Sequence, residues 1–354
     1  MSRRFVVGVL LLVWGAAAGA ATLRVPADYP TIRNAAFEAL EGDTVLVGPG
    51  TYRDRLTIWQ KNIVLRGEMG ADATIIDGSV GVGNVITLVR NNRSMILEDL
   101  TITGGSFNPA SPECTGAAVY INQGHATVQR CKMIENQGSA VGGVDVYFFS
   151  RPLIRDCFVA YNRGGGIIIE TDTGEPGPAA ELYNNTVVHN TGYGIGVIKG
   201  GRAIIENNTV AYNTGDGIRS EITLGSGAGK CFVTVRNSII THNGGGGIVR
   251  RETLGACYTL ECNDVWGNAG VQGGVTGNYQ GYSPGDGCFG GRGAGDVSFD
   301  PIYRNAAADD FLLAPESPLF TLCVPGSCGV LGAGNQCTNA VEAKSWTAVK
   351  LLYR

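Results

Sequence analysis

The sequence has few charged residues: Asp, Glu, Lys and Arg make up 16% of its 354 residues, whereas 44% are hydrophobic. A chain this poor in charge and this rich in apolar side chains is not intrinsically disordered. Its formal net charge of −4 also provides no electrostatic basis for binding nucleic acid or an anionic membrane. No Cys-x-x-Cys pair and no Cys/His cluster has zinc-site spacing, so we expect no metal site of that kind.

Long apolar runs are also missing, apart from Phe5–Ala18, which is too short to span a membrane comfortably. The cationic Ser2-Arg3-Arg4 precedes this run and the small-residue site Ala18-Gly19-Ala20 follows it, a combination typical of a signal peptide. We expect residues 1–21 to be removed on export, so that the mature chain is secreted, extracellular or at the cell surface and has no membrane span. The alternative is a retained membrane anchor.

A segment that keeps returning is the most informative feature of the chain. Ile205–Gly217 reads IENNTVAYNTGDG, and Leu182–Gly194 reads LYNNTVVHNTGYG. Less similar copies are Val128–Ala140, Ile154–Gly166, Val235–Gly247, Leu260–Gln272 and a degenerate one from Leu97. Self-similarity at a period of about 20–50 residues is typical of a solenoid.

Each copy has an apolar residue, a polar or small residue three later, an apolar residue two after that, and Asn three further on. This spacing fits two short strands separated by a corner, and no helical period fits it. The closing asparagines tolerate the left-handed backbone that a corner needs, and 54 glycines supply it elsewhere. The asparagines are Asn136, Asn162, Asn190, Asn213, Asn243 and Asn268. A third strand follows at once, as at Ile167–Ile169, Ile195–Ile198, Ile218–Ser220 and Ile248–Arg250.

Three short strands per copy predict an all-β fold, a right-handed single-stranded parallel β-helix. Equivalent residues of successive coils then lie about 4.8 Å apart, so that inward Ile and Val form one core and corner asparagines can hydrogen-bond along the stack. A leucine-rich repeat is the competing fold, but it requires a denser leucine pattern and a helix in each repeat.

The two ends of the chain depart from the repeat. Asp28–Leu40 is predicted to form a short capping helix with Asp28 or Thr31 as its N-cap. The expected β-helix domain is 22–340, comprising a repeat core at about 85–272 and a C-terminal closing segment at 273–340, and 341–354 is expected to be a short helix or a sorting tail.

All ten cysteines lie between Cys114 and Cys337, and an even number in an exported chain favours disulfides. Cys131 and Cys157 hold the same repeat position in successive copies, so they are either a bonded pair or a stack of buried free thiols. The other candidate pairs are Cys231 with Cys257 and Cys323 with Cys328.

This repeat resembles that of the pectin-lyase-like β-helix family, and the resemblance covers nearly all of the mature chain. It is specific for the fold rather than for a function. It implies a bacterial exported protein whose active site, if present, lies on the outer face of one strand column between flanking loops. Here the third strands form that column, because the insertions Thr171–Ala180 and Thr223–Lys230 leave from it.

Alignment of the coils on the closing Asn gives the outward residues of this column. Glu170, Arg219 and Glu221 are predicted to form a shallow groove; Asp145, Tyr147 and Arg251 are further outward positions of the same column and candidate ligand-binding residues. In a polysaccharide lyase, Glu170 and Glu221 could neutralise a substrate carboxylate, with Ca²⁺ as a candidate cofactor, and Arg219 could remove the adjacent proton. Arginine is a base only when strongly perturbed, and solvated cross-strand ion pairs are the alternative.

A second candidate ligand-binding site is the residue before the closing Asn. In four successive coils this position holds a ring: Tyr161, His189, Tyr212 and His242. Such a ladder could stack against sugar rings or shield a corner of the core.

The signatures of the family's enzymes are absent. Where polygalacturonases carry NTD, GHG and RIK, this chain has NNTV, GHA at Gly124–Ala126 and VIKG at Val197–Gly200. The pectate lyase stretch RxPxxR has its nearest match in RPLIR at Arg151–Arg155, and the catalytic strands of pectinesterases are absent. We therefore expect a non-catalytic protein that binds a polysaccharide or a cell-surface glycan. The alternative is a divergent lyase or glycoside hydrolase acting on an acidic polysaccharide.

Overall fold

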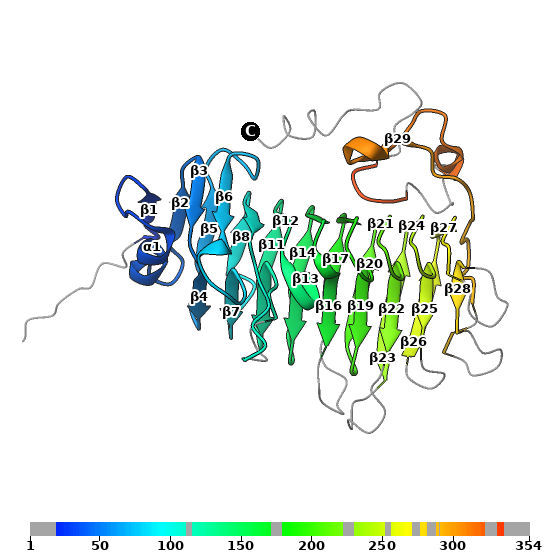
Figure 1. Ribbon diagram of the computed structural model, residues 1–354, viewed down its shortest axis with the longest axis horizontal. Helices are drawn as coiled ribbons and strands as arrows, with labels where there is room; N and C mark the ends of the chain where they lie inside the picture. Colours follow the sequence, from blue (N-terminus) through cyan, green and yellow to red (C-terminus); the bar gives the residue numbers. More distant parts are fainter. Residues whose placement is uncertain are drawn as a thin grey trace, which may run out of the picture.

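The computed structural model describes residues 19–110, 115–170, 179–221, 230–251, 256–270, 277–281, 288–289, 291–322 and 331–335. Its strands stack into a parallel β-helix with three long faces (Figure 1). Each coil contributes one strand to each of three parallel sheets, here named A, B and C. The predicted three-strand coil is confirmed, and the sheets already include the strands before residue 85.

The strands are assigned to the sheets as follows. Sheet A contains β1 (Thr22–Val25), β2 (Thr44–Val47), β5 (Val64–Gly67), β8 (Ile96–Glu98), β11 (Thr127–Gln129), β14 (Leu153–Arg155), β17 (Ala180–Tyr183), β20 (Arg202–Glu206), β23 (Cys231–Arg236) and β26 (Ala256–Glu261). Sheet B contains β3 (Gly50–Arg53), β6 (Thr74–Asp77), β9 (Thr101–Thr103), β12 (Lys132–Ile134), β15 (Phe158–Ala160), β18 (Thr186–Val188), β21 (Thr209–Ala211), β24 (Ile239–Thr241) and β27 (Asp264–Trp266). Sheet C contains β4 (Leu56–Trp59), β7 (Ile86–Val89), β10 (Val119–Asn122), β13 (Gln137–Tyr147), β16 (Arg163–Glu170), β19 (Ile195–Ile198), β22 (Ile218–Glu221), β25 (Ile248–Arg250) and β28 (Tyr279–Gln280).

The core runs along the axis of the helix because the apolar residue that opens each copy points inward. In sheet A the register joins these residues into one fully buried column: Leu97, Val128, Ile154, Leu182, Ile205 and Val235. Alternate residues of the same strands face solvent, as the period of two requires.

The closing asparagines form a buried ladder, as predicted. From Asn136 onward, each side-chain Nδ2 donates to Oδ1 of the Asn in the next coil, over 2.9–3.0 Å as far as Asn268. Their expected backbone conformation was wrong, however. The left-handed residue is the one before the Asn, such as Tyr161 with φ 59° or His189 with φ 55°. The amide must point into the stack, so the preceding residue makes the corner.

The N-terminal helix is confirmed in a shorter form. α1 spans Ile32–Glu38, and the Thr31 hydroxyl accepts a hydrogen bond from the Asn34 N–H over 3.1 Å, which makes Thr31 the N-cap. Ile32, Ala35 and Ala36 are buried against the first coils, so the helix covers one end of the core. Among the described residues, no helix is long and apolar enough to cross a membrane.

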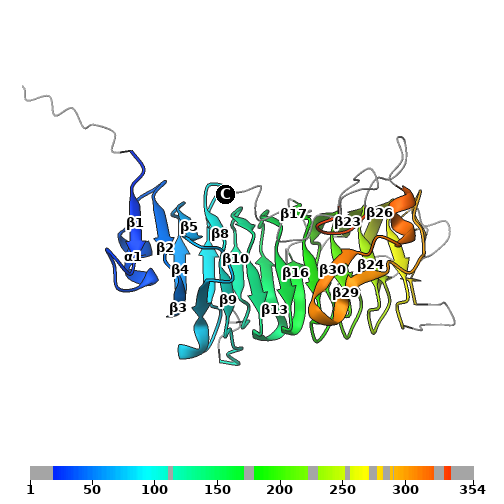
Figure 2. The ribbon, with the colours of Figure 1, turned by 90° about the horizontal axis from the view of Figure 1, so that it is seen from above.

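After the last coil the chain folds back along sheet B. β29 (Tyr303–Asn305) and β30 (Asp310–Leu313) form an antiparallel hairpin over the outer face of this sheet (Figure 2). The remaining short elements are the 3₁₀ helices η1 (Gly78–Val80), η2 (Ala306–Ala308) and η3 (Pro318–Leu322). Residues 1–18 and 336–354 lie outside the described part, so the leader cleavage and the form of the tail stay predictions.

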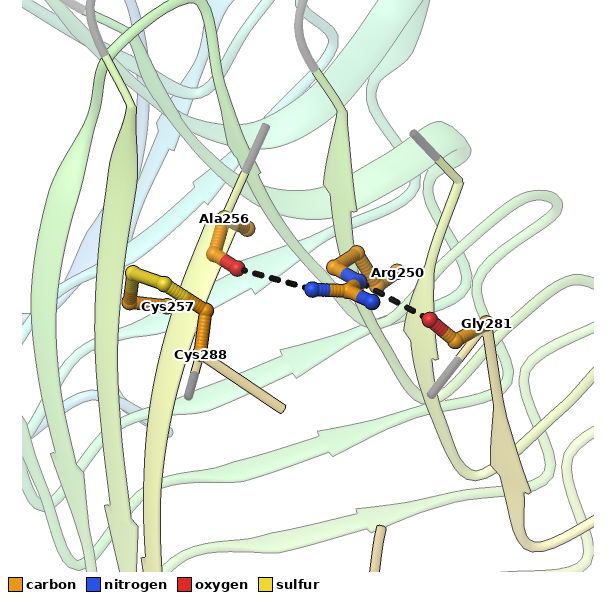
Figure 3. The surroundings of a disulfide bond; sticks show 5 residues. All are labelled: Arg250, Ala256, Cys257, Gly281 and Cys288. Atoms are coloured by element: carbon orange, nitrogen blue, oxygen red, sulfur yellow. Dashed lines mark hydrogen bonds between the residues drawn. A yellow bond between two sulfur atoms is a disulfide. The ribbon is translucent and has the colours of Figure 1, made fainter. Parts of the chain in front are cut away.

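Some of the described cysteines are free thiols, and others are disulfide-bonded. Cys131, Cys157 and Cys231 are buried free thiols, so the stacked pair is not bonded and the pairing of Cys231 with Cys257 was wrong. Cys257 is instead bonded to Cys288, and the buried Arg250 nearby donates to the carbonyl oxygens of Ala256 and Gly281 (Figure 3). The pair Cys323 and Cys328 lies outside the described residues.

Candidate functional site

A cavity of about 420 Å³ lies on the outer face of sheet C. Its lining comes from β13, β16, β19 and β22, and from three residues outside these strands, Thr115, Tyr193 and Lys199. The predicted facing is confirmed, because the register pairs Asp145 with Ile168 in the next coil and Gly196 with Arg219 further along. Glu170 and Glu221 are likewise on one column, with Ile198 between them. The structure therefore brings Asp145, Glu170, Arg219 and Glu221 to one cavity.

Both glutamates are paired with cations of the chain itself. Lys199 Nζ lies 3.1 Å from Glu170 Oε2, and the Arg219 guanidinium contacts the Glu221 carboxylate. Lys199 stands in the corner after β19 and was not identified from the sequence, because the strand alignment considers only residues within strands. Among the described residues, no group of three or more His, Cys, Asp or Glu side chains could hold a metal ion. Calcium stays a prediction.

Asp145 is the most buried acidic group of the cavity, with 2% of its surface exposed. Burial, together with the negative charge of Glu170, raises its pKa from 3.8 to about 7. A hydrogen bond with the Thr115 side chain and the positive charge of Lys199 act in the opposite direction and lower this pKa. Its Oδ1 is buried and has no hydrogen-bond partner among the described residues. A carboxyl group in this state can accept or release a proton near neutral pH.

Tyr193 is the second residue that the sequence did not reveal. It precedes β19, and its ring lies over two glycines of the sheet: a Cβ added to Gly165 or Gly196 would come within 2.5 or 2.6 Å of the ring. The Arg219 guanidinium carbon lies 5.6 Å from the ring centroid. Burial is the main cause that raises the pKa of Tyr193, so the hydroxyl keeps its proton at neutral pH. Glycine at these two positions could have been the sequence signal, since both leave room on the outer face.

Two of the predicted outward residues, Tyr147 and Arg251, are not part of the cavity lining. Tyr147 stacks on Tyr120, with ring centroids 6.1 Å apart. Arg251 is drawn to the buried Asp216, with Nη2 2.6 Å from Oδ2. Asp216 therefore neutralises Arg251, and neither residue forms part of the cavity wall.

The aromatic ladder stacks as the repeat predicts. The ring centroids of Tyr161, His189, Tyr212 and His242 follow one another at 5.2, 5.4 and 4.7 Å. The C-terminal hairpin packs against it: Phe311 lies 5.9 Å from Tyr212, and Tyr161 donates to Asp309 over 2.7 Å. This contact favours a packing role, while sugar binding at the exposed edge stays a prediction.

Comparison with solved structures finds several chains to which this one is similar. A pectin methylesterase from Aspergillus niger is 13% identical with a TM-score of 0.44, covering 80% of this chain and 91% of that one. One from carrot is 16% identical with a TM-score of 0.42, covering 89% and 99%. The A-module of the mannuronan C-5 epimerase AlgE4 from Azotobacter vinelandii is 17% identical with a TM-score of 0.40, covering 64% and 70%.

A comparison with curated proteins finds no match. The sequence does match the family described as "Right handed beta helix region" over residues 81–249 and 171–282, which together cover more than half of the chain. The stacked parallel sheets agree with this description. The chain therefore belongs to the right-handed parallel β-helix family.

Proposed function

We propose that the protein acts outside the cell on an acidic polysaccharide, by removing a sugar proton next to a carboxylate. The observation that carries this proposal is the cavity on sheet C, which the buried Asp145 lines together with two cations and a tyrosine. One oxygen of this carboxyl group has no hydrogen-bond partner among the described residues. A polymer could lie along the outer face of the sheet, because equivalent positions repeat there from coil to coil. The Cys257–Cys288 disulfide and the predicted leader support an exported protein.

The chemistry proposed for the cavity is a β-elimination. The Asp145 carboxylate accepts the proton on the carbon next to the sugar carboxylate, and the electrons of that C–H bond form a C=C bond. The C–O bond at the neighbouring carbon breaks, and its oxygen takes a proton from the Tyr193 hydroxyl or from water. Lys199 and Arg219 can offset the negative charge that develops on the substrate carboxylate. The Arg219 guanidinium contacts the Glu221 carboxylate, so we assign the base to Asp145 instead of Arg219.

A non-catalytic glycan-binding protein is the second candidate. It is favoured by the pairing of Lys199 with Glu170 and of Arg219 with Glu221, which leaves little free positive charge in the cavity. In that case Asp145 would be a buried structural carboxyl group, and the cavity would bind sugars through hydrogen bonds.

The experiment incubates the mature protein with polygalacturonate, alginate and glycosaminoglycans, with and without calcium, and follows the ultraviolet absorbance of unsaturated uronates. We expect product from at least one substrate, at a rate that rises as the pH passes about 7, where Asp145 becomes ionised. Asp145→Asn should abolish it. Asp72→Asn is the matched control, since Asp72 is exposed and pairs with Lys132 outside the cavity. Binding of these polymers without any product would favour the second candidate.

A further inference from the structure

Four aromatic side chains adjoin the cavity on the side of the earlier coils: Tyr120, Tyr147, Phe148 and Phe149. We call them the aromatic platform. Tyr120 is the register partner of Asp145 in the preceding coil, and Tyr147 follows Asp145 by two residues on the same face of β13. The Phe148 N–H donates to the Glu170 carbonyl oxygen over 3.1 Å, which ties the platform to the strand that lines the cavity.

The rings form a continuous surface. Tyr147 lies 6.1 Å from Tyr120 and 6.0 Å from Phe148, and Phe148 meets Phe149 edge-on at 4.8 Å. Tyr120 is 4% exposed and supports the others from below, whereas Phe149 is 37% exposed. An aromatic surface that is firmly packed beneath and open above can stack on the apolar face of a sugar ring.

The backbone at this corner is unusual. Single left-handed residues form many corners of the described chain, but Phe148 and Phe149 are two consecutive non-glycine residues with φ of 43° and 54°. Ser150 holds the corner, because its hydroxyl accepts from the Gly124 N–H over 3.1 Å and contacts the Ile121 carbonyl oxygen over 3.1 Å. Strain of this kind persists where the surrounding structure fixes it, and it is concentrated at functional sites.

Two exposed cations stand at the same edge of sheet C. The Arg90 guanidinium donates to the Gln123 side-chain oxygen over 2.9 Å, and the Gln123 N–H donates to the Phe148 carbonyl oxygen over 3.1 Å. Arg151 follows Phe149 by two residues in the sequence, and its charge helps to lower the pKa of His125, after burial. Neither arginine forms an ion pair with any residue that the structure describes. The edge is therefore positively charged.

We propose that the aromatic platform, together with Arg90 and Arg151, is a second subsite for an acidic glycan, adjoining the Asp145 cavity. A sugar ring stacks on Phe149 and Tyr147, its carboxylate is attracted to Arg151 or Arg90, and the next sugars of the same chain enter the cavity. The proposal rests on the proposed function, since it needs a glycan in the cavity. It adds that the ligand is a polymer bound along the axis of the solenoid and not a single sugar.

The test measures the affinity of oligogalacturonates and oligomannuronates of increasing length, from disaccharides upward, by calorimetry. It compares the wild type with Phe149→Ala and Arg151→Ala. Phe232→Ala is the matched control, because Phe232 is also 37% exposed but lies on sheet A, where Arg202 stacks on it at 4.8 Å. Phe149 is at the surface, so its removal is not expected to unfold the protein, and thermal melting checks this.

We expect affinity to rise with oligomer length in the wild type. Phe149→Ala should lower the affinity for the longest oligomers by about three- to tenfold and leave disaccharide binding unchanged. Arg151→Ala should lower the affinity for the longest oligomers by a factor that becomes smaller as salt is added, because exposed charges are screened. Equal affinities for Phe149→Ala and Phe232→Ala at every length would overturn the subsite.

The same variants separate this proposal from the proposed function. Length-dependent binding that Phe149→Ala removes, without turnover of any polymer, would leave the subsite standing and overturn the chemistry. Turnover that Asp145→Asn abolishes, with no effect of Phe149→Ala on binding at any oligomer length, would support the chemistry and overturn the subsite. If none of these oligomers binds to the wild type, the subsite proposal fails, and the proposed function fails as well if no polymer is turned over.

Discussion

The carboxyl group of Asp145 shows how much a single position depends on its surroundings. From the sequence it is one of several outward residues of a strand, with no feature that separates it from Glu170 or Glu221. In the structure it is a buried residue of the cavity wall, and its pKa rises to about 7. The same burial that makes Asp145 a candidate base also makes its ionisation costly. The ionisation of Asp145 should therefore affect the stability of the protein as well as its chemistry.

We predict that the contribution of Asp145 to stability falls as the pH rises from about 4 to about 7. The pKa of Asp145 is raised from 3.8 to about 7, so the folded state binds more protons than the unfolded state in this window. Its contribution is fully present below the unfolded pKa and is lost as the pH rises through the folded one. Asp264, also raised to about 7 by burial, acts in the same direction.

Urea denaturation at a series of pH values measures this effect. Asp145→Asn should flatten the fall in unfolding free energy between pH 4 and pH 7, whereas Asp72→Asn should leave it unchanged, because the Asp72 side chain is 54% exposed. Parallel curves for the wild type and Asp145→Asn would show that the folded state does not raise this pKa.

At the scale of the elements, the corners are where the repeat is specified. Most strands have only three or four residues, so few backbone hydrogen bonds hold each of them and the register depends on the residues between strands. The asparagine ladder provides the contacts between coils that fix this register. Asn213 alone joins Asn190, Asn243 and the carbonyl oxygens of Val187 and Ala211.

Asn213→Ala is therefore expected to cost about 3 kcal/mol or more, since several buried groups lose their partners and each is worth about 1–3 kcal/mol. Asn305→Ala is the control, because Asn305 is exposed and makes no capping bond with its side chain. Both are measured by chemical denaturation. A cost below about 1 kcal/mol for Asn213→Ala would mean that water or a backbone shift replaces the ladder.

For the whole molecule, the C-terminal hairpin and the solenoid are two layers joined by apolar contacts. Phe311 of β30 packs on Ala160, Val188 and Ala211 of sheet B, while Tyr303 bonds to Thr241 over 2.8 Å. The coils contact only their neighbours, so this layer spans several of them and ties them together.

Removal of Phe311, which is 4% exposed, tests this connection. Phe311→Ala should cost about 3 kcal/mol or more and release the hairpin before the coils unfold. Hydrogen exchange should then speed up in β29 and β30 while the amides of β18 and β21 stay protected. Equal acceleration in all four strands would show that the hairpin and the coils unfold as one unit. The control is Val80→Ala, at an exposed apolar position far from the hairpin. It should change neither the stability of the protein nor the hydrogen exchange of β29 and β30.

Much of the candidate site could be predicted from the repeat. Once the closing asparagines set the alignment, the period of two fixed the outward facing of Asp145, Glu170, Arg219 and Glu221. Lys199 and Tyr193 escaped this reasoning because they stand at corners, where no strand period applies and a long side chain can reach over several coils. The ring of Tyr193 reaches the sheet only because Gly165 and Gly196 leave room for it.

The β-helix, its three strands per coil, its asparagine ladder and the face on which charged residues gather were all predictable, because they follow from a local pattern repeated many times. The repeat did not predict which cation pairs with which carboxylate, how deeply Asp145 is buried, which cysteines are bonded, or where the C-terminal hairpin packs. These depend on contacts between residues far apart in the chain or on side-chain reach, for which the repeat contains no information.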